Sequence, residues 1–232
     1  GAGKFRHISL CRTFEEFQRM ASSRANLVLA PTGVQAAKDM ERALGIPFLL
    51  LPVSYRIGEI EAGYRQLRDF LAPSDAEPDL SAECAAALRA VEAALRAVGD
   101  RPVIVDASAV TRPFGLARAL LEYGFSVRRV VAQKCIPIDR ENLDWLEGNR
   151  PDVELVQPRH HRAVRFEGRL AEALAIGVDG AYLAGARHVV DLFADGTLFG
   201  FHGLRVLMER MRAAAEAETD LERLIESYGL VV

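Results

Sequence analysis

Short apolar runs of β type alternate with segments of helical periodicity along nearly the whole chain. The expected strands are residues 5–10, 26–30, 47–53, 102–107, 126–132, 153–156 and 178–184. Apolar residues recur at helical spacing between them, in segments 14–20, 34–44, 60–71, 115–124, 142–149 and 166–177. Such alternation predicts an α/β fold with doubly wound parallel sheets. Right-handed crossovers then bring the carboxyl ends of the strands to one edge of each sheet.

A long Ala-rich segment divides the chain. It follows Ser74-Asp75 and ends at Gly99, with Pro102 shortly after. A capped helix followed by Gly and Pro is a typical boundary signal. We therefore expect two Rossmann-like domains, residues 1–99 and 100–232, the second closing with one or two helices.

Composition excludes several classes of protein. The net charge is −3, whereas nucleic-acid binders usually carry a basic face. No apolar run approaches the roughly 20 residues that span a bilayer. Three widely separated cysteines suit a reducing cytoplasm and exclude a disulfide framework. Neither GxGxxG nor GxxxxGK[ST] occurs, which argues against a nicotinamide dehydrogenase and a P-loop ATPase.

The turn after the expected strand 26–30 contains Pro31-Thr32-Gly33. In open α/β sheets ligands bind past the carboxyl ends of the strands, often at a helix N-terminus. We therefore consider Thr32 a candidate cofactor contact. The alternative is a plain N-cap, which contributes about 1 kcal/mol. Residues 108–115 form a second strand-to-helix turn of this kind.

Two adjacent histidines stand between arginines after the expected strand 153–156: Arg159, His160, His161 and Arg162. Neighbours on an extended chain face opposite sides, so both histidines do not easily reach one metal ion. The arginines favour an anion over a bare cation. Three interpretations stay open for this segment: a solvated helix start, a contact to an anion or cofactor carboxylate, and a metal ligand.

Cysteines and a further histidine are the remaining metal candidates. Cys11 ends the first expected strand and Cys135 follows the strand at 126–132, so both are expected at a ligand edge. With His160 they suggest a thiolate–imidazole site, whose donors suit zinc or an iron–sulfur cluster. Cys84 lies inside the Ala-rich helix and is expected to pack as a small apolar residue. His188 is a weaker candidate ligand, with a locally satisfied polar group as the alternative.

Four segments together resemble the nitrogenase component 1 proteins. Residues 26–70 resemble that family's middle domain, with an "NLV" strand, a helix, a "GIP" turn and a helix bearing Leu-Arg. Residues 112–131, "RPFGLARALLEYGFSVRRVV", resemble the strand–helix–strand that opens its final domain. Residues 151–177 and 199–211 resemble its closing part. The resemblance covers nearly the whole chain, in the family's order and spacing.

The resemblance implies an oxidoreductase. Such subunits have three α/β domains and assemble as homo- or hetero-oligomers. They accept electrons from an ATP-dependent iron protein and reduce dinitrogen or the double bonds of tetrapyrroles. An iron–sulfur cluster is held at the subunit interface by cysteines of the N-terminal domain. We interpret Gly1-Ala2-Gly3 as the remnant of a tag and the chain as a fragment without that domain. The fragment is expected to hold no cluster and to be inactive alone.

Two departures from the family pattern concern cofactor ligands. The family's cofactor cysteine closely follows the "NLV" strand, where this chain has Ala30 or Pro31. Its cofactor histidine follows the last strand, where Ala184-Gly185 is expected here and His188 comes a few residues later. A sulfur-rich cofactor bound as in nitrogenase is therefore not expected.

The substrate stays open. A cavity between the domains could hold an organic macrocycle, a different cluster or nothing, and Arg159 and His160 are suitable partners for carboxylates. The competing interpretations are a non-catalytic binding or cofactor-assembly scaffold on the same fold, and an unrelated α/β enzyme acting on a small anion.

Overall fold

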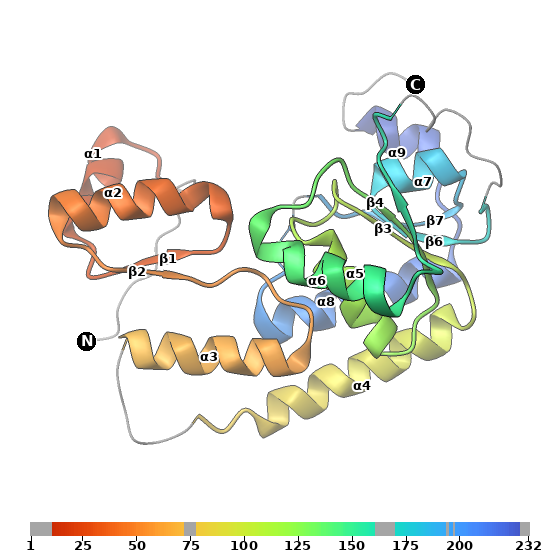
Figure 1. Ribbon diagram of the computed structural model, residues 1–232, viewed down its shortest axis with the longest axis horizontal. Helices are drawn as coiled ribbons and strands as arrows, with labels where there is room; N and C mark the ends of the chain where they lie inside the picture. The colour runs from red at the N-terminus through yellow and green to blue at the C-terminus, as the bar shows by residue number, and fades with distance from the viewer. Residues whose placement is uncertain (1–10, 72–77, 161–169, 194, 197, 228–232) are drawn as a thin grey trace. The chain divides into compact units, whose positions relative to one another are not determined.

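The computed structural model describes residues 11–71, 78–160, 170–193, 195–196 and 198–227. By contacts between residues the chain divides into a first unit, Gly1–Pro52 with Gln66–Asp75, and a second unit, Val53–Arg65 with Ala76–Val232 (Figure 1). Helix α4 (Ser81–Val98) precedes residue 99, the boundary expected from the sequence, and packs against α8 (Gly200–Glu216) in the second unit. Helix α3 (Ile57–Leu71) begins in the second unit and ends in the first.

The first unit is built around a β–α–β element. Its elements are α1 (Phe14–Gln18), η2 (Arg19–Ser22), β1 (Asn26–Val28), η3 (Pro31–Gly33), α2 (Val34–Leu44) and β2 (Phe48–Leu50). The two strands are parallel, with Asn26 opposite Phe48. Helix α2 ends because Gly45 adopts the left-handed conformation, with φ of 68°. The predicted alternation of strand, helix and strand is thus confirmed here, with shorter strands.

The second unit contains a parallel sheet of five strands among the described residues. These are β3 (Val103–Asp106), β4 (Val127–Val131), β5 (Glu154–Val156), β6 (Leu174–Ile176) and β7 (His188–Val190). Their spatial order is β5-β4-β3-β6-β7, with every pair parallel. In order of the sequence this is 3-2-1-4-5, the arrangement of a doubly wound Rossmann-like sheet. The predicted fold class is confirmed.

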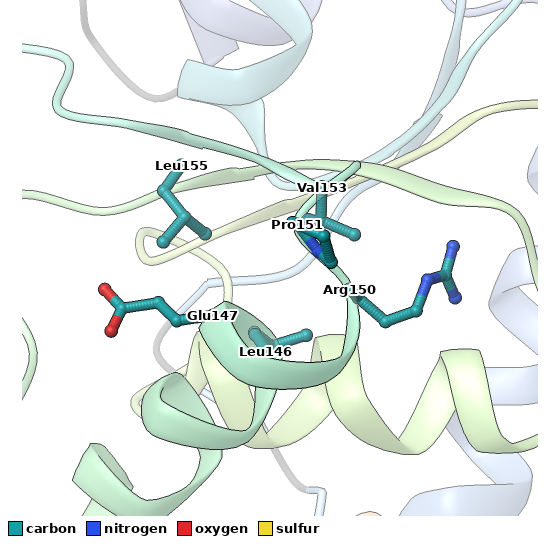
Figure 2. A pocket seen from close by; sticks show the side chains of 6 residues that line it. All are labelled: Leu146, Glu147, Arg150, Pro151, Val153 and Leu155. Atoms are coloured by element: carbon teal, nitrogen blue, oxygen red, sulfur yellow. The ribbon is translucent and has the colours of Figure 1, made fainter.

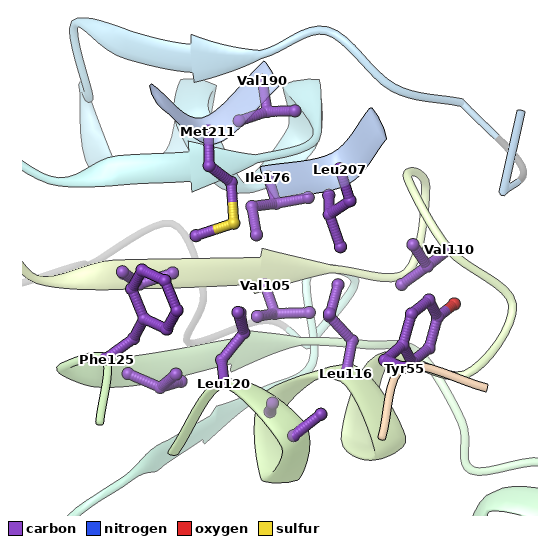
Figure 3. Packing of buried hydrophobic residues seen from close by; sticks show 14 of the residues in the cluster. Tyr55, Val105, Val110, Leu116, Leu120, Phe125, Ile176, Val190, Leu207 and Met211 are labelled. Atoms are coloured by element: carbon purple, nitrogen blue, oxygen red, sulfur yellow. The ribbon is translucent and has the colours of Figure 1, made fainter. Parts of the chain in front are cut away.

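Helices cover both faces of this sheet. They include α5 (Pro113–Glu122), η4 (Pro137–Asp139), α6 (Arg140–Asn149), α7 (Val178–Ala184) and α9 (Leu221–Ser227). On one face, the strands pack against α4, α5, α6 and α8. Figure 3 shows Leu116 and Leu120 of α5 and Met211 of α8 on this face. Helices α7 and α9 cover the other face, where Ala181 is fully buried. Strand β3 is buried on both faces, as expected for the centre of such a sheet.

Two element predictions in the second half are wrong. Residues 178–184, expected as a strand, form helix α7, because Gly177 and Gly185 have positive φ at its two ends and so delimit one short helix. The strand lies just before it, at Leu174–Ile176, inside the expected helix 166–177. The last strand is β7, so His188 begins that strand and does not follow it.

Some predicted features lie outside the described residues. These are the strand at 5–10 and the segment 161–169, which includes His161, Arg162 and the start of the expected helix 166–177. The expected closing helices are α8 and α9. No described helix combines the length and apolar character needed to cross a bilayer.

Candidate functional site at the carboxyl edge of the second unit

The carboxyl edge of the five-stranded sheet is the candidate site of the second unit. The chain leaves β3 toward β4 on one side, and β6 lies on the other side of β3. The order of the strands therefore reverses between β3 and β6, and this switch point is where doubly wound sheets bind ligands. At the switch point itself, α5 begins after β3 and α7 begins after β6.

Asp106 occupies the switch point. This last residue of β3 is only 2% exposed. Its carboxylate accepts hydrogen bonds from Ser108 N at 2.7 Å, Ser108 Oγ at 2.9 Å and Gly180 N, in α7, at 2.6 Å. Burial raises the pKa of Asp106 although these donors act in the opposite direction. A Cβ atom at Gly177 would lie 2.8 Å from Cβ of Asp106, so no larger residue fits beside it.

Asp139 occupies the N-terminus of α5 in a similar way. It is fully buried and accepts hydrogen bonds from Phe114 N at 3.0 Å and Gly115 N at 2.9 Å. Asn142 Nδ2 donates to the same carboxylate at 3.0 Å, and Arg112 Nε lies 3.6 Å from it. Burial raises the pKa of Asp139, outweighing the amide and guanidinium groups that favour its ionised form.

Asp195 lies in the segment after β7 and forms hydrogen bonds with the segment after β3. It accepts hydrogen bonds from Tyr55 Oη at 2.7 Å, from Thr111 N at 3.1 Å and from the Thr111 hydroxyl. Burial, followed by the nearby Asp195 charge, raises the pKa of Tyr55 well above its ordinary value. Tyr55 is therefore a neutral hydrogen-bond donor, and the contacts fasten two loops at this edge.

The segment that enters α3 is fixed at the same end of the sheet. Arg112 Nη1 donates to the carbonyl of Val53 at 3.0 Å and to Ser54 Oγ at 3.2 Å. The Tyr123 hydroxyl donates to the carbonyl of Tyr55 at 2.9 Å. Burial raises the pKa of Tyr123 to about 12, so it too stays protonated. The edge is consequently dense with hydrogen bonds made within the chain.

Sequence reasoning did not select these carboxylates. Asp106 closes an otherwise apolar strand, which was a readable signal of a polar group at the ligand edge. The position of Asp139 was less informative, because an aspartate directly before a helix is usually interpreted as its N-cap. Asp195 gave none, because its partner Thr111 is 84 residues away.

Arg159, His160 and Cys135 lie at the outer part of the same edge. Arg159 and His160 form an exposed turn after β5, in which His160 N donates to Gln157 O at 3.0 Å. Cys135 follows β4, the strand paired with β5, and its Sγ donates to Ile136 O at 3.4 Å. The structure thus places the three predicted residues after the carboxyl ends of neighbouring strands.

Thr32 lies in the first unit. It is exposed within η3, and α2 begins after Gly33 without any side-chain cap. The expected N-cap is therefore wrong, because a 3₁₀ turn runs directly into the helix and Thr32 lies inside that turn.

His188 and Cys11 are the remaining metal candidates. His188 starts β7 at the opposite end of the sheet, where its Nδ1 lies 2.9 Å from Ala214 O and 3.0 Å from Ala217 O. It thereby satisfies carbonyl groups at the end of α8. Cys11 lies in the first unit, just before the Thr13 cap of α1.

Cys84 and Cys135 each form a hydrogen bond through the thiol group. Burial, then the contact of Cys84 Sγ with Glu61 Oε1 at 3.2 Å, raises the pKa of Cys84 to about 11. Burial also raises the pKa of Cys135. Within the part of the chain that the structure describes, no three His, Cys, Asp or Glu side chains are grouped to hold a metal ion.

A shallow depression lies elsewhere on the second unit. It has a volume of about 200 Å³, smaller than typical ligand pockets. Figure 2 shows its lining residues, which come from the end of α6, the turn that follows it and β5: Leu146, Glu147, Arg150, Pro151, Val153 and Leu155. It opens beside the start of β5, whereas the candidate site lies beyond the carboxyl ends of the strands.

Comparisons with known proteins identify the family of the chain and support the α/β fold described above. The sequence matches the nitrogenase component 1 type oxidoreductase family over residues 4–216, and the chain therefore belongs to this family. The fold is similar to that of the solved structure "Nitrogenase Cp1 at pH 6.5", with a TM-score of 0.62 and 15% sequence identity. The match covers 87% of this chain and 47% of that one, so this chain spans about half of that structure's length. Nothing among the curated proteins matches the sequence.

Proposed function

We propose that this chain corresponds to the two C-terminal domains of a component 1 type subunit whose full-length form receives electrons from an ATP-dependent iron protein. The full-length protein then reduces a substrate in the cytoplasm as a homo- or hetero-oligomer. The observation that carries this proposal is the continuous family match over residues 4–216. The 232-residue chain alone is expected to be inactive.

An iron–sulfur cluster of the full-length protein is proposed to take its ligands from the N-terminal domain that the family resemblance implies. Among the described residues no three His, Cys, Asp or Glu side chains are grouped to hold a metal ion, and the thiols of Cys84 and Cys135 are hydrogen-bonded within the chain.

Arg159 and His160 are the proposed ligand contacts of the second unit. Asp106 and Asp139 already occupy the backbone N–H groups nearer the switch point. Ligand contacts then fall to the outer part of the edge, where Arg159 and His160 are exposed. A guanidinium group binds a carboxylate through paired hydrogen bonds, so a ligand carrying carboxylates fits this position. Thr32 is the corresponding proposed contact of the first unit.

A non-catalytic scaffold that assists cofactor assembly is the second candidate. The observation that favours it is the occupation of the switch point by Asp106 of the chain itself. A scaffold would bind a cofactor or its precursor at an outer surface and would exchange no electrons with an iron protein.

Complex formation with the iron protein separates the two candidates. Full-length protein would be mixed anaerobically with the iron protein of the same organism, MgADP and aluminium fluoride, which mimics the transition state of ATP hydrolysis. We expect a complex of defined stoichiometry on gel filtration with multi-angle light scattering. MgADP without fluoride serves as the control. A failure to form any complex, with no stimulation of ATP hydrolysis, would favour the scaffold.

A further inference from the structure

Three hydrogen-bond donors and one guanidinium group surround the side chain of Asp139 at the start of α5. They are two backbone N–H groups, of Phe114 and Gly115, the Asn142 amide and the Arg112 guanidinium, at 2.9 to 3.6 Å. Helix α5 follows the central strand β3. In the 3-2-1-4-5 topology, the N-terminus of this helix is where dinucleotides place their pyrophosphate. An aspartate from the chain itself takes that position here.

Arg112 supplies a second, independent sign of an anion position. The residue is 8% exposed, and its Nε has no hydrogen-bond partner among the described residues. Two acceptors, Val53 O and Ser54 Oγ, hold the other end of the guanidinium. A buried N–H without a hydrogen bond costs stability unless a negative charge lies nearby, and the closest one is Asp139 at 3.6 Å.

Gly115 leaves the space that the carboxylate fills. A Cβ atom at this position would lie 3.0 Å from Asp139 Oδ1 and 3.2 Å from Asn142 Nδ2. The close approach of backbone to an anion is a recognised use of glycine at such turns. The shape as well as the charge of the α5 N-terminus is therefore matched to a carboxylate.

We propose that the N-terminus of α5 is a carboxylate-binding cradle whose resident ligand is Asp139. This residue keeps the second unit closed to phosphate-bearing ligands at the position where its topology would hold a dinucleotide. A group tethered within the chain has a high effective concentration, so a free anion competes poorly for the same donors. The inference is independent of the electron-transfer function proposed above.

Chemical rescue of Asp139→Gly tests the cradle. The substitution removes the equivalent of acetate and leaves the donors unpaired. We expect the melting temperature of the second unit to fall by roughly 5–10 °C. Acetate or formate should restore at least half of the loss with a saturable dependence, whereas chloride at equal ionic strength should not. Asp139→Asn, which fills the space with a donor group, should not respond to either carboxylate.

Asp144→Gly is the matched control for this rescue. Asp144 is an exposed residue of α6 whose carboxylate pairs with Arg140. Its replacement removes the same atoms at the surface, so acetate should restore nothing. If acetate raises the melting temperature of Asp139→Gly no more than that of Asp144→Gly, the proposed cradle is contradicted. The same conclusion follows if Asp139→Gly is unfolded and acetate does not refold it.

A titration of the unmodified protein tests whether Asp139 excludes phosphate from the N-terminus of α5. Backbone N–H resonances of Phe114 and Gly115 should keep their chemical shifts when inorganic phosphate or ADP is added to millimolar concentration. A saturable shift of these two resonances would show that phosphate enters the site in the presence of Asp139, and would overturn the proposed closure.

Discussion

Asp106 and Asp139 are buried carboxylates at an edge where related folds bind ligands. A buried charge is costly unless hydrogen bonds replace its water, and backbone N–H groups provide them at both positions. The same pairing satisfies donors at the start of α5 and α7, which would otherwise lack partners. These two residues therefore stabilise the starts of α5 and α7, and they also occupy N–H groups at the edge where related folds bind ligands.

The buried carboxyl group of Asp106 predicts a pH dependence of stability. Burial raises its pKa in the folded protein. The stabilising contribution of its bound proton is thus complete below the unfolded pKa, about 3.9, and is lost as pH rises through the higher folded value. Relative to Asp106→Asn, the free energy of unfolding of the unmodified protein should fall over this window and then stay level. Urea titrations at a series of pH values measure this, and a constant difference throughout would contradict it.

Arg159 and His160 are exposed, so their removal should leave the fold intact. We expect Arg159→Ala and His160→Ala to change the free energy of unfolding by no more than about 0.5 kcal/mol. Binding of a tetrapyrrole carrying carboxylates to the full-length protein should weaken by roughly tenfold for Arg159→Ala, which is the loss of one charge-assisted pair. Calorimetric titration measures the affinity. Unchanged binding with a large loss of stability would assign these residues a structural role.

At the scale of elements, Gly177 decides how β6 joins α7. Its φ of 111° is unfavourable for any other residue, and an added Cβ would lie 2.8 Å from Asp106 Cβ. We expect Gly177→Ala to destabilise the second unit by about 2–5 kcal/mol. Gly148→Ala in α6 is the control, because nothing lies within 4 Å of the added atom and alanine favours a helix by about 0.5–1 kcal/mol. Equal effects of the two changes on denaturant midpoints would refute this role.

Most elements could be predicted from periodicity, and the exceptions have a physical reason. Helices such as α2 and α6 present one apolar side and long strands such as β4 fill the core, so their patterns were readable. Strand β6 is three residues long and fully buried, hence without alternation, and it resembles the interior of a helix. Helix α7 contains Val178 and Tyr182, whose strand preference is overridden by the glycines at its ends.

The candidate site could be predicted only in part. The expected strands placed Arg159, His160 and Cys135 after β5 and β4, where the structure also has them, and their role as ligand contacts stays a prediction. Pairings such as Asp106 with Gly180, 74 residues apart, exist only in the folded chain. A sequence shows that an aspartate ends a strand but not which N–H groups it meets.

At the scale of the whole molecule, the family match and the fold agree with each other, but the chain spans only about half the length of the matched nitrogenase structure. The chain covers 47% of the matched nitrogenase structure, and no three His, Cys, Asp or Glu side chains are grouped to hold a metal ion among the residues that the structure describes. We therefore expect the 232-residue chain, purified anaerobically and treated with iron and sulfide, to bind no stoichiometric cluster. Iron and acid-labile sulfide assays measure this. A cluster that survives gel filtration would contradict this expectation, and its disappearance in Cys135→Ser would show that Cys135 is a cluster ligand.

Electron delivery to the full-length protein tests the central claim most directly. The full-length protein would be incubated anaerobically with the iron protein of the same organism, a reductant and MgATP, and followed by electron paramagnetic resonance during a single turnover. We predict reduction of a centre in the full-length protein that requires hydrolysable ATP and is lost with a non-hydrolysable analogue. Unchanged spectra with MgATP, despite an active iron protein, would contradict the assignment of this chain to an electron-accepting oxidoreductase.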